Sequence, residues 1–267
     1  MIAARAGPSL PDGRSAVPLL KAIEIRRFTA PDAVQGVAVG QRAVYVIADR
    51  AIAKYDKASG RKLTEWSDTT GEVVHLNSCT VRKARLYCAH SNFPHLPMTS
   101  SIEIFDAGTL AHVGHVSLGL TSGSLTWLDY RAGHWWLCFA NYSGAGGAPS
   151  RGTAWTELAE YDRRWQPRQA WVFPPAVLRA FGRMSASGGA WGPDGYLYVS
   201  GHDRPELYVL RLPEFGSVLE QVATISVPGH GQAFGWEPSG GRVLYMIDRS
   251  TRTIISSRIP PVPPAGK

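Results

Sequence analysis

Charged residues are scarce in this chain. Asp, Glu, Lys and Arg together make up 18% of its 267 residues, whereas hydrophobic residues make up 44% and nine residues are Trp. Disordered chains are rich in charge and poor in apolar side chains, so this composition excludes disorder and provides for a large core. An all-β chain of this length commonly remains a single domain.

Long apolar runs are also missing. No window approaches the roughly eighteen apolar residues of a membrane helix, and the first residues, MIAARAGPSLPDGRS, lack the apolar core of a signal peptide. We therefore expect a soluble chain with no membrane partner.

Clustered positive charge is absent despite a net charge of +7. Nucleic-acid binders concentrate Lys and Arg on one face or in one run, but here the adjacent basic pairs are scattered. These pairs are Arg26–Arg27, Arg61–Lys62, Arg82–Lys83 and Arg163–Arg164. A solvated basic surface explains this pattern, and no nucleic-acid partner is expected.

Two familiar catalytic motifs are missing as well. The chain has no HExxH pair for a metal ion and no GxSxG turn for a serine nucleophile. The small residues around Ser185 and Ser187 fit an inner strand in a crowded place better than a nucleophile turn. Any chemistry must therefore come from residues that the fold brings together.

What the chain does contain is an internal repeat. A buried, often aromatic strand that ends in polar residues recurs five times, as AVYVIADR at 43, RLYCAHSN at 85, HWWLCFAN at 134, GYLYVSGHD at 195 and RVLYMIDR at 242. A short strand and a tight turn precede each copy, and a third strand follows it. Three of the third strands close with an aromatic-Asp step at Asp56, Asp106 and Asp162, which lie 50 and 56 residues apart.

This spacing resembles the broad β-propeller repeat class, including the NHL, YVTN and WD40 types. With a fourth strand in each remaining stretch, five four-stranded blades use up the chain. We therefore predict one all-β domain, a five-bladed propeller, with flexible ends at 1–18 and 259–267. The alternatives are a six-bladed propeller with a degenerate blade within 142–183, or a β-sandwich; residues 174–181 could form a short helix.

The last repeat lacks a fourth strand, because IPPVPPAGK follows its third one, whereas a spare strand, KAIEIRRF, precedes the first repeat. We predict that residues 21–28 pair with residues 252–258 and close the ring. Closure of this kind removes exposed sheet edges.

The cysteines number three. If a turn centres on residues 83 and 84, Cys79 and Cys88 face each other across a hairpin, within the distance that a disulfide needs. The alternative is two small buried residues. A bridge would persist only in an oxidising compartment and would favour a secreted or periplasmic protein over a cytoplasmic one, whereas Cys138 fits a packed thiol.

Polar residues gather where a propeller has its funnel mouth, at the starts of inner strands and the ends of second strands. Convergent polar groups in a concave site are the usual sign of a ligand site, and the alternative is that they satisfy loop backbone. We predict His75, His90, His202 and Asp203 as catalytic residues. The predicted substrate-binding residues are Gln35, Asp49, Arg50, Asn77, Asn92, Asn141, Tyr142, Arg183, Gln232 and Asp248.

The three histidines could instead hold a divalent metal ion, since neutral imidazole is a common ligand. His75 and His90 could equally form a hydrogen-bonded pair, or one of them could act as an acid or base. Inner-strand starts lack the carboxylates that five-bladed glycosidases typically place there. The metal-binding set of gluconolactonase-type propellers is matched only loosely, through Asn77, Asn141 and Asp203.

Two long connections follow His90 and Asn141 and are rich in Gly, Pro and aromatic residues. Long loops on a rigid scaffold often carry binding specificity, so we expect them to wall a pocket with Phe93, His95, Tyr142 and Trp155.

Two functions remain open. The first is an enzyme, a hydrolase, lyase or isomerase, that acts on a small oxygen-rich molecule such as a lactone, sugar or cyclic acid. The second is a non-catalytic propeller that binds a glycan, peptide or protein on the same face. In either case we expect a monomer with a small-molecule or glycan ligand, and a divalent metal ion is the one cofactor that the residues suggest.

Overall fold

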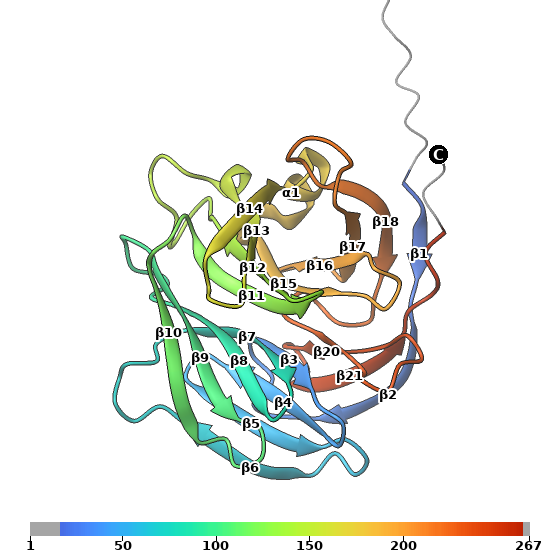
Figure 1. Cartoon of the computed structure of the whole chain (residues 1–267). Helices are drawn as coiled ribbons and strands as arrows, with labels where there is room; N and C mark the ends of the chain where they lie inside the picture. The colour runs from blue at the N-terminus through green and yellow to red at the C-terminus, as the bar shows by residue number, and fades with distance from the viewer. Residues whose placement is uncertain (1–16, 264–267) are drawn as a thin grey trace, which may run out of the picture.

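The computed structural model describes residues 17–263, and its strands form five sheets arranged around a common centre (Figure 1). Each sheet is one blade of a five-bladed β-propeller, as the repeats predict. The first blade contains β3 (Gly36–Val39), β4 (Ala43–Ala48), β5 (Ala51–Asp56) and β6 (Lys62–Ser67). The second contains β7 (Leu76–Arg82), β8 (Arg85–Ser91), β9 (Thr99–Asp106) and β10 (His112–Leu120).

The remaining three blades follow in chain order around the ring. The third contains β11 (Ser124–Arg131), β12 (His134–Ala140), β13 (Glu157–Tyr161) and β14 (Pro167–Val172). The fourth contains β15 (Ala186–Trp191), β16 (Leu197–Gly201), β17 (Glu206–Arg211) and β18 (Glu220–Ser226). The fifth contains β19 (Gly235–Trp236), β20 (Val243–Asp248) and β21 (Thr253–Arg258). The first strand of each blade packs against its counterparts at the axis.

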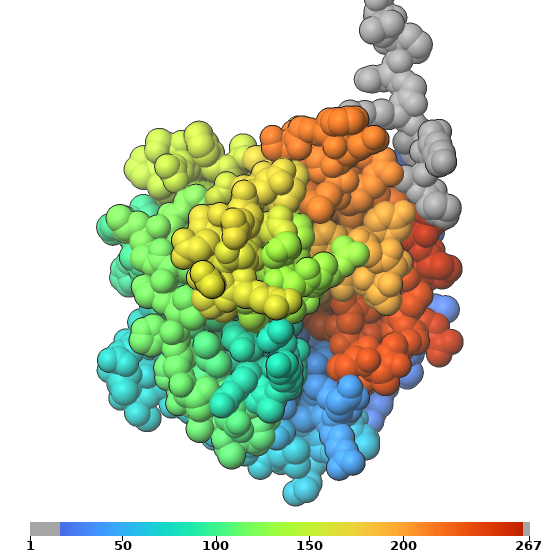
Figure 2. Space-filling model, in the orientation of Figure 1, coloured from blue at the N-terminus to red at the C-terminus, as the bar shows by residue number. Residues whose placement is uncertain are grey.

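A strand from the start of the chain completes the fifth blade. β2 (Ile23–Thr29) pairs antiparallel with β21, from Ile23 opposite Arg258 to Thr29 opposite Thr253, which confirms the predicted closure. In the space-filling view the first, blue part of the ring lies beside the last, red part (Figure 2). The ring is therefore closed by hydrogen bonds between the two ends of the repeat array.

The segment that closes the ring forms two strands, where the sequence predicts one. A single strand over residues 21–28 is expected, but the chain bends at Ala22 and Lys21 belongs to a separate strand, β1 (Leu19–Lys21). β1 pairs parallel with β18 of the fourth blade, and the Ala22 N–H donates to Ser226 O at 2.9 Å. The N-terminal segment thus joins two blades.

The chain ends outside the repeats are described in part. Thr224 N donates to Pro18 O at 2.9 Å, and Ile259, only 1% exposed, donates its N–H to Arg242 O. These residues of the predicted flexible ends therefore pack on the propeller. Residues 1–16 and 264–267 lie outside the described residues.

Segment 142–183, where a sixth blade was considered, holds two strands of the third blade and short helices. The expected helix is α1 (Pro175–Phe181), which is followed directly by the 3-10 helix η2 (Gly182–Met184) and contacts the 3-10 helix η1 (Thr153–Trp155). Val177 and Phe181 of α1 are buried one turn apart, and the Phe181 ring packs edge-on against Tyr208. Within residues 17–263 no helix is both long and apolar enough to cross a membrane.

The aromatic-Asp steps have a structural role. Oδ1 of Asp56 accepts the N–H of Ser59, Oδ1 of Asp106 accepts that of Thr109, and Oδ1 of Asp162 accepts that of Gln166. Hydrogen bonds from backbone N–H groups lower the pKa of all three carboxyl groups, because only the ionised form accepts them fully. The repeated Asp therefore stabilises the turn after the third strand of the first three blades.

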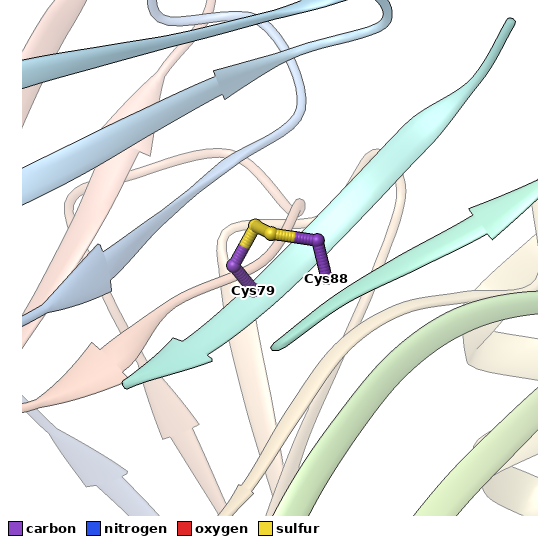
Figure 3. Close-up of a disulfide and its surroundings, with 2 residues drawn as sticks. All are labelled: Cys79 and Cys88. Carbon is purple, nitrogen blue, oxygen red and sulfur yellow. A yellow bond between two sulfur atoms is a disulfide. The ribbon is translucent and has the colours of Figure 1, made fainter. Parts of the chain in front are cut away.

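Cys79 on β7 and Cys88 on β8 form a disulfide, as the hairpin register predicts (Figure 3). Cys79 lies opposite Cys88, Thr80 opposite Tyr87, and Arg82 opposite Arg85 beside the turn. The remaining thiol, Cys138, is buried, and burial raises its pKa. It is thus a packed, protonated side chain.

Candidate functional site

A pocket of about 420 Å³ lies at the end of the axis where the inner strands begin. Its size falls within the range of small-molecule sites. Its polar lining comes from inner-strand starts and second-strand ends: Gln35, Asp49, His75, Asn77, Thr126, Ser187, His202, Gln232 and Arg249. Its apolar wall is made by Val74, Phe93, Pro94, Tyr142 and Met184.

Asp49 and His75 form a carboxylate-imidazole pair in this funnel pocket. His75 Nδ1 lies 2.9 Å from Asp49 Oδ1, which also accepts from Gln35 Nε2 at 2.6 Å. The hydrogen bond from His75, then that from Gln35, holds the pKa of Asp49 below its usual value. An ionised carboxylate can only accept, so Nδ1 of His75 carries the proton of this contact and Nε2 is the nitrogen left for another partner.

The free nitrogen of His75 is the reactive feature of this pair. No residue of the described chain forms a hydrogen bond with His75 Nε2, although the side chain is only 13% exposed. Phe93 packs on the imidazole with ring centroids 5.0 Å apart. A neutral imidazole with one nitrogen held by a carboxylate and the other open to a pocket is suited to accept a proton.

His202 is bound at both ring nitrogens. Its Nδ1 lies 2.5 Å from Asp203 Oδ1, and its Nε2 lies 3.0 Å from Arg249 Nη1. Because the guanidinium can only donate, Nε2 accepts in the contact with Arg249, and Nδ1 faces the Asp203 carboxylate. With its amide oxygen turned toward these donors, Gln232 also accepts from Arg249 Nη1, at 2.9 Å. His202 and Gln232 therefore position Arg249 at the pocket.

The two long connections form part of the wall. Phe93 and Tyr142 line the pocket and pack edge-to-face with centroids 5.0 Å apart, as expected. Gly146 lets the second loop approach this wall, since a Cβ there would meet the Phe93 ring at 2.2 Å. His95 is exposed and Trp155 is 57% exposed, and neither lines the pocket.

Five of the predicted binding residues lie elsewhere and hold loops or strands. Arg50 pairs with Asp68, Asn92 and Asn141 donate to Pro97 O and Trp155 O, Arg183 donates to Ser143 O, and Asp248 accepts from Ser250. These contacts match the alternative interpretation, in which strand-end polar groups satisfy the backbone of loops. The structure therefore gathers Gln35, Asp49, Asn77, Tyr142 and Gln232, but not these five.

His90 also lies outside the funnel pocket, which corrects its predicted catalytic position. β8 continues to Ser91, so His90 is still paired in the sheet, opposite Ser101, and faces a groove of about 610 Å³ between the first and second blades. Asp49 and His202 instead come directly after their strands end, where the chain can turn toward the axis.

The three predicted metal ligands are consequently separated. His90 accepts from Val74 N through Nε2 and bonds Ser101 Oγ through Nδ1, while both nitrogens of His202 are engaged. Across residues 17–263 no group of three or more His, Cys, Asp or Glu side chains is placed to hold a metal ion. The predicted site of His75, His90 and His202 is not assembled.

The pKa of His90 lies below its usual value, mainly because the side chain is buried. The negative charges of Glu103 and Asp68 raise this pKa and His75 lowers it, but burial is the largest effect. Geometry favours the same neutral form, because protonation of Nε2 would oppose the Val74 N–H. The unfolded chain, with a His pKa of about 6.5, takes up this proton first as the pH falls, so the free energy of unfolding must decrease below that pH.

We expect the wild type to lose more stability than His90→Gln when the pH is lowered from about 8 to about 5. Urea unfolding at several pH values measures this difference. His115→Gln, at an exposed position of β10, should keep the wild-type pH dependence. Parallel curves for the wild type and His90→Gln would contradict the effect.

Arg249 is the principal lining residue that the predicted binding set leaves out, although it stands with Asp248 at the end of a second strand. It directly follows Asp248, the last residue of β20, and alternate residues of a strand point to opposite faces. An Asp-Arg step gives no direction by itself, because its second residue lines the pocket at Asp248–Arg249 whereas its first residue does so at Asp49–Arg50. Val74, Pro94 and Met184 are apolar lining residues without a distinctive signal.

Solved structures with a similar fold exist. A glutaminyl cyclase from Myxococcus xanthus aligns with a TM-score of 0.64 and 12% identity, over 91% of this chain and 98% of that chain. A luciferin-regenerating enzyme aligns with a TM-score of 0.53 and 10% identity, over 90% of this chain and 96% of that chain. At such identities the similarity shows the propeller fold alone. No protein-family model and no curated protein matches the sequence.

Proposed function

We propose that this chain is a propeller enzyme that acts on a small oxygen-rich molecule, a lactone, sugar or cyclic acid, in its funnel pocket. His75 is the general base for hydrolysis, elimination or isomerisation, three reactions that each begin with removal of a proton from water or from carbon. The observation that carries the proposal is the His75 imidazole, which lines the pocket, is held by Asp49 at Nδ1 and has no hydrogen-bond partner at Nε2 among the described residues.

The proton can be followed through a hydrolysis. His75 Nε2 takes a proton from water as its oxygen attacks the carbonyl carbon of the substrate, and the C–O bond to the leaving oxygen then breaks. The imidazolium returns its proton to that leaving oxygen, which restores neutral His75. Asp49 keeps the ring in one tautomer and stabilises the positive charge while it lasts. No step uses a metal ion.

The fold supports this proposal only generally. Two structures with a similar fold are named as enzymes, a glutaminyl cyclase and a luciferin-regenerating enzyme, so such a ring can carry a reaction centre. Similar folds often carry unrelated functions, so the residues of the pocket and not the fold carry the proposal.

Asp49→Asn tests the pair that orients the base. The wild type is first screened against lactones, sugar lactones and cyclic acids. Ring opening is measured through the release of protons, and isomerisation through the uptake of deuterium from heavy water. We expect one of these substrate classes to be turned over. Asp49→Asn should lower kcat about 10-fold to 100-fold with little change in KM, because a positioning group acts mainly on the chemical step.

The matched control removes a carboxylate elsewhere. Glu214 is exposed in the connection between β17 and β18, so Glu214→Gln should keep wild-type kinetics. The proposal would be contradicted if Asp49→Asn kept the wild-type kcat. It would also be contradicted if the wild type turned over no substrate class of the screen.

A binding propeller remains the competing function, favoured by the aromatic wall of Phe93 and Tyr142 beside the amides of Gln35, Asn77 and Gln232. Such walls suit sugar rings, and a binder needs no base. It would hold its ligand equally well after His75→Gln and would show no turnover.

A further inference from the structure

The guanidinium of Arg249 has no anionic partner in the described part of the chain. It lines the funnel pocket, and none of the ion pairs formed by residues 17–263 includes it. Neither of its two protein contacts is a carboxylate: Nη1 donates to His202 Nε2 at 3.0 Å and to Gln232 Oε1 at 2.9 Å. A positive charge is thus fixed at the pocket by acceptors that do not neutralise it.

These two contacts use the two N–H donors of Nη1. Nε and Nη2, the donors on the other edge of the guanidinium, make no hydrogen bond to any residue that the structure describes. Two parallel N–H groups on one edge match the two oxygens of a planar carboxylate. The edge that remains is therefore the one that binds carboxylates in a bidentate manner.

The rest of the pocket restricts the size and place of such a ligand. Arg249 acts on Asp49 through its charge and lowers the pKa of that carboxyl, so the cation and the Asp49–His75 pair share one pocket. Phe93, Tyr142 and Met184 add apolar surface, and the volume of about 420 Å³ suits a small molecule. A carboxylate at Arg249 leaves the remainder of the molecule facing His75.

We propose that Arg249 binds the carboxylate of the substrate, and that the substrate class is a small monocarboxylic acid that carries a hydroxyl or a cyclic ester or amide. This inference rests on the proposed function, because it gives the ligand of the same pocket. His202, Asp203 and Gln232 are positioning residues that hold the guanidinium in place.

Matched probes that differ only in charge test the assignment. The protein is labelled with ¹⁵N and titrated with two acid–amide pairs, lactate with lactamide and mandelate with mandelamide. The measured signal is the Nε–H resonance of Arg249, which is assigned beforehand because it disappears in Arg249→Lys. We expect saturable shifts with both carboxylates and at least about tenfold weaker binding of both amides, since charged hydrogen bonds are roughly twice as strong as neutral ones.

Arg249→Lys keeps the charge but not the two-pronged edge, so carboxylate affinity should fall about tenfold while thermal unfolding stays close to that of the wild type. Arg249→Gln removes the charge as well and should abolish the difference between acids and amides. Arg204→Lys, at an exposed position that forms a pair with Glu206 outside the pocket, should change neither affinity.

The assignment is overturned if amides bind as tightly as carboxylates, if inorganic phosphate binds as tightly as lactate, or if Arg249→Lys leaves affinity unchanged. Binding only of peptides with a free C-terminal carboxylate would overturn the small-molecule class. The two proposals can fail independently. His75→Gln should still bind the acids, because Arg249 is unchanged in this variant. If turnover requires His75 but not Arg249, the proposed function holds and the assignment of Arg249 is wrong.

Discussion

Replacing His75 with glutamine is expected to lower kcat/KM for the substrate class found by screening about 100-fold to 10,000-fold. This is the usual contribution of a positioned general base, and glutamine keeps a similar size and a hydrogen-bond donor for Asp49 while removing the basic nitrogen. The ring of His75 packs on Phe93 and lines the pocket, so the propeller should fold normally without it. Steady-state kinetics and thermal unfolding measure the two effects separately.

The other histidines provide the controls. His115→Gln, on the exposed side of β10, should keep wild-type kinetics. His202→Gln should lose less activity than His75→Gln, because both ring nitrogens of His202 are already bound, to Asp203 and Arg249. A larger loss at His202, or equal losses at all three positions, would show that the base has been assigned to the wrong residue.

The fold was predictable because its signals repeat. Each blade carries the same buried second strand and the same turn, so five weak patterns support one another in a way that a single strand cannot. The disulfide followed from one hairpin, since a tight turn at Lys83 fixes the register that places Cys79 opposite Cys88. The parallel pairing of β1 with β18 left no such signal, because three residues at an outer edge have neither a repeat nor a buried face.

Half of the predicted binding residues line the pocket, and a shift of one residue decides the direction of a side chain. His90 lies inside β8 and faces the groove between blades, whereas Ser91 beside it is fully buried and bonds Ser124 of the next blade. Asp248 accepts from Ser250 in a turn, whereas Arg249 beside it reaches the pocket. Composition and spacing place such residues at the funnel mouth, but the last paired residue of each strand is set by contacts that only the folded ring contains.

Gly189→Ala is expected to destabilise the propeller by about 3 kcal/mol, at the upper end for an overpacked core. Gly189 lies on β15 at the axis, and a Cβ there would come within 2.4 Å of Trp127 Cε2, 2.5 Å of Cζ2 and 2.7 Å of Cδ2. The Trp127 ring cannot easily retreat, because it is fully buried in a cluster with Trp136, Phe173 and Trp191. The backbone of Gly189 is not in the left-handed region, so the clash alone is responsible.

A double-mutant cycle distinguishes this clash from a general loss of packing. Trp127→Leu alone should lower the free energy of unfolding by several kcal/mol, because it leaves a cavity. In the Gly189→Ala background the new methyl group occupies part of that cavity. The double variant should therefore be more stable than the sum of the two single effects predicts. Gly108→Ala is the control, since its Cβ would meet only Asp106 Oδ1, at 3.0 Å. Urea unfolding gives the four free energies. Additive losses would mean that the inner strands of the third and fourth blades are not in the close contact on which the geometry of the funnel depends.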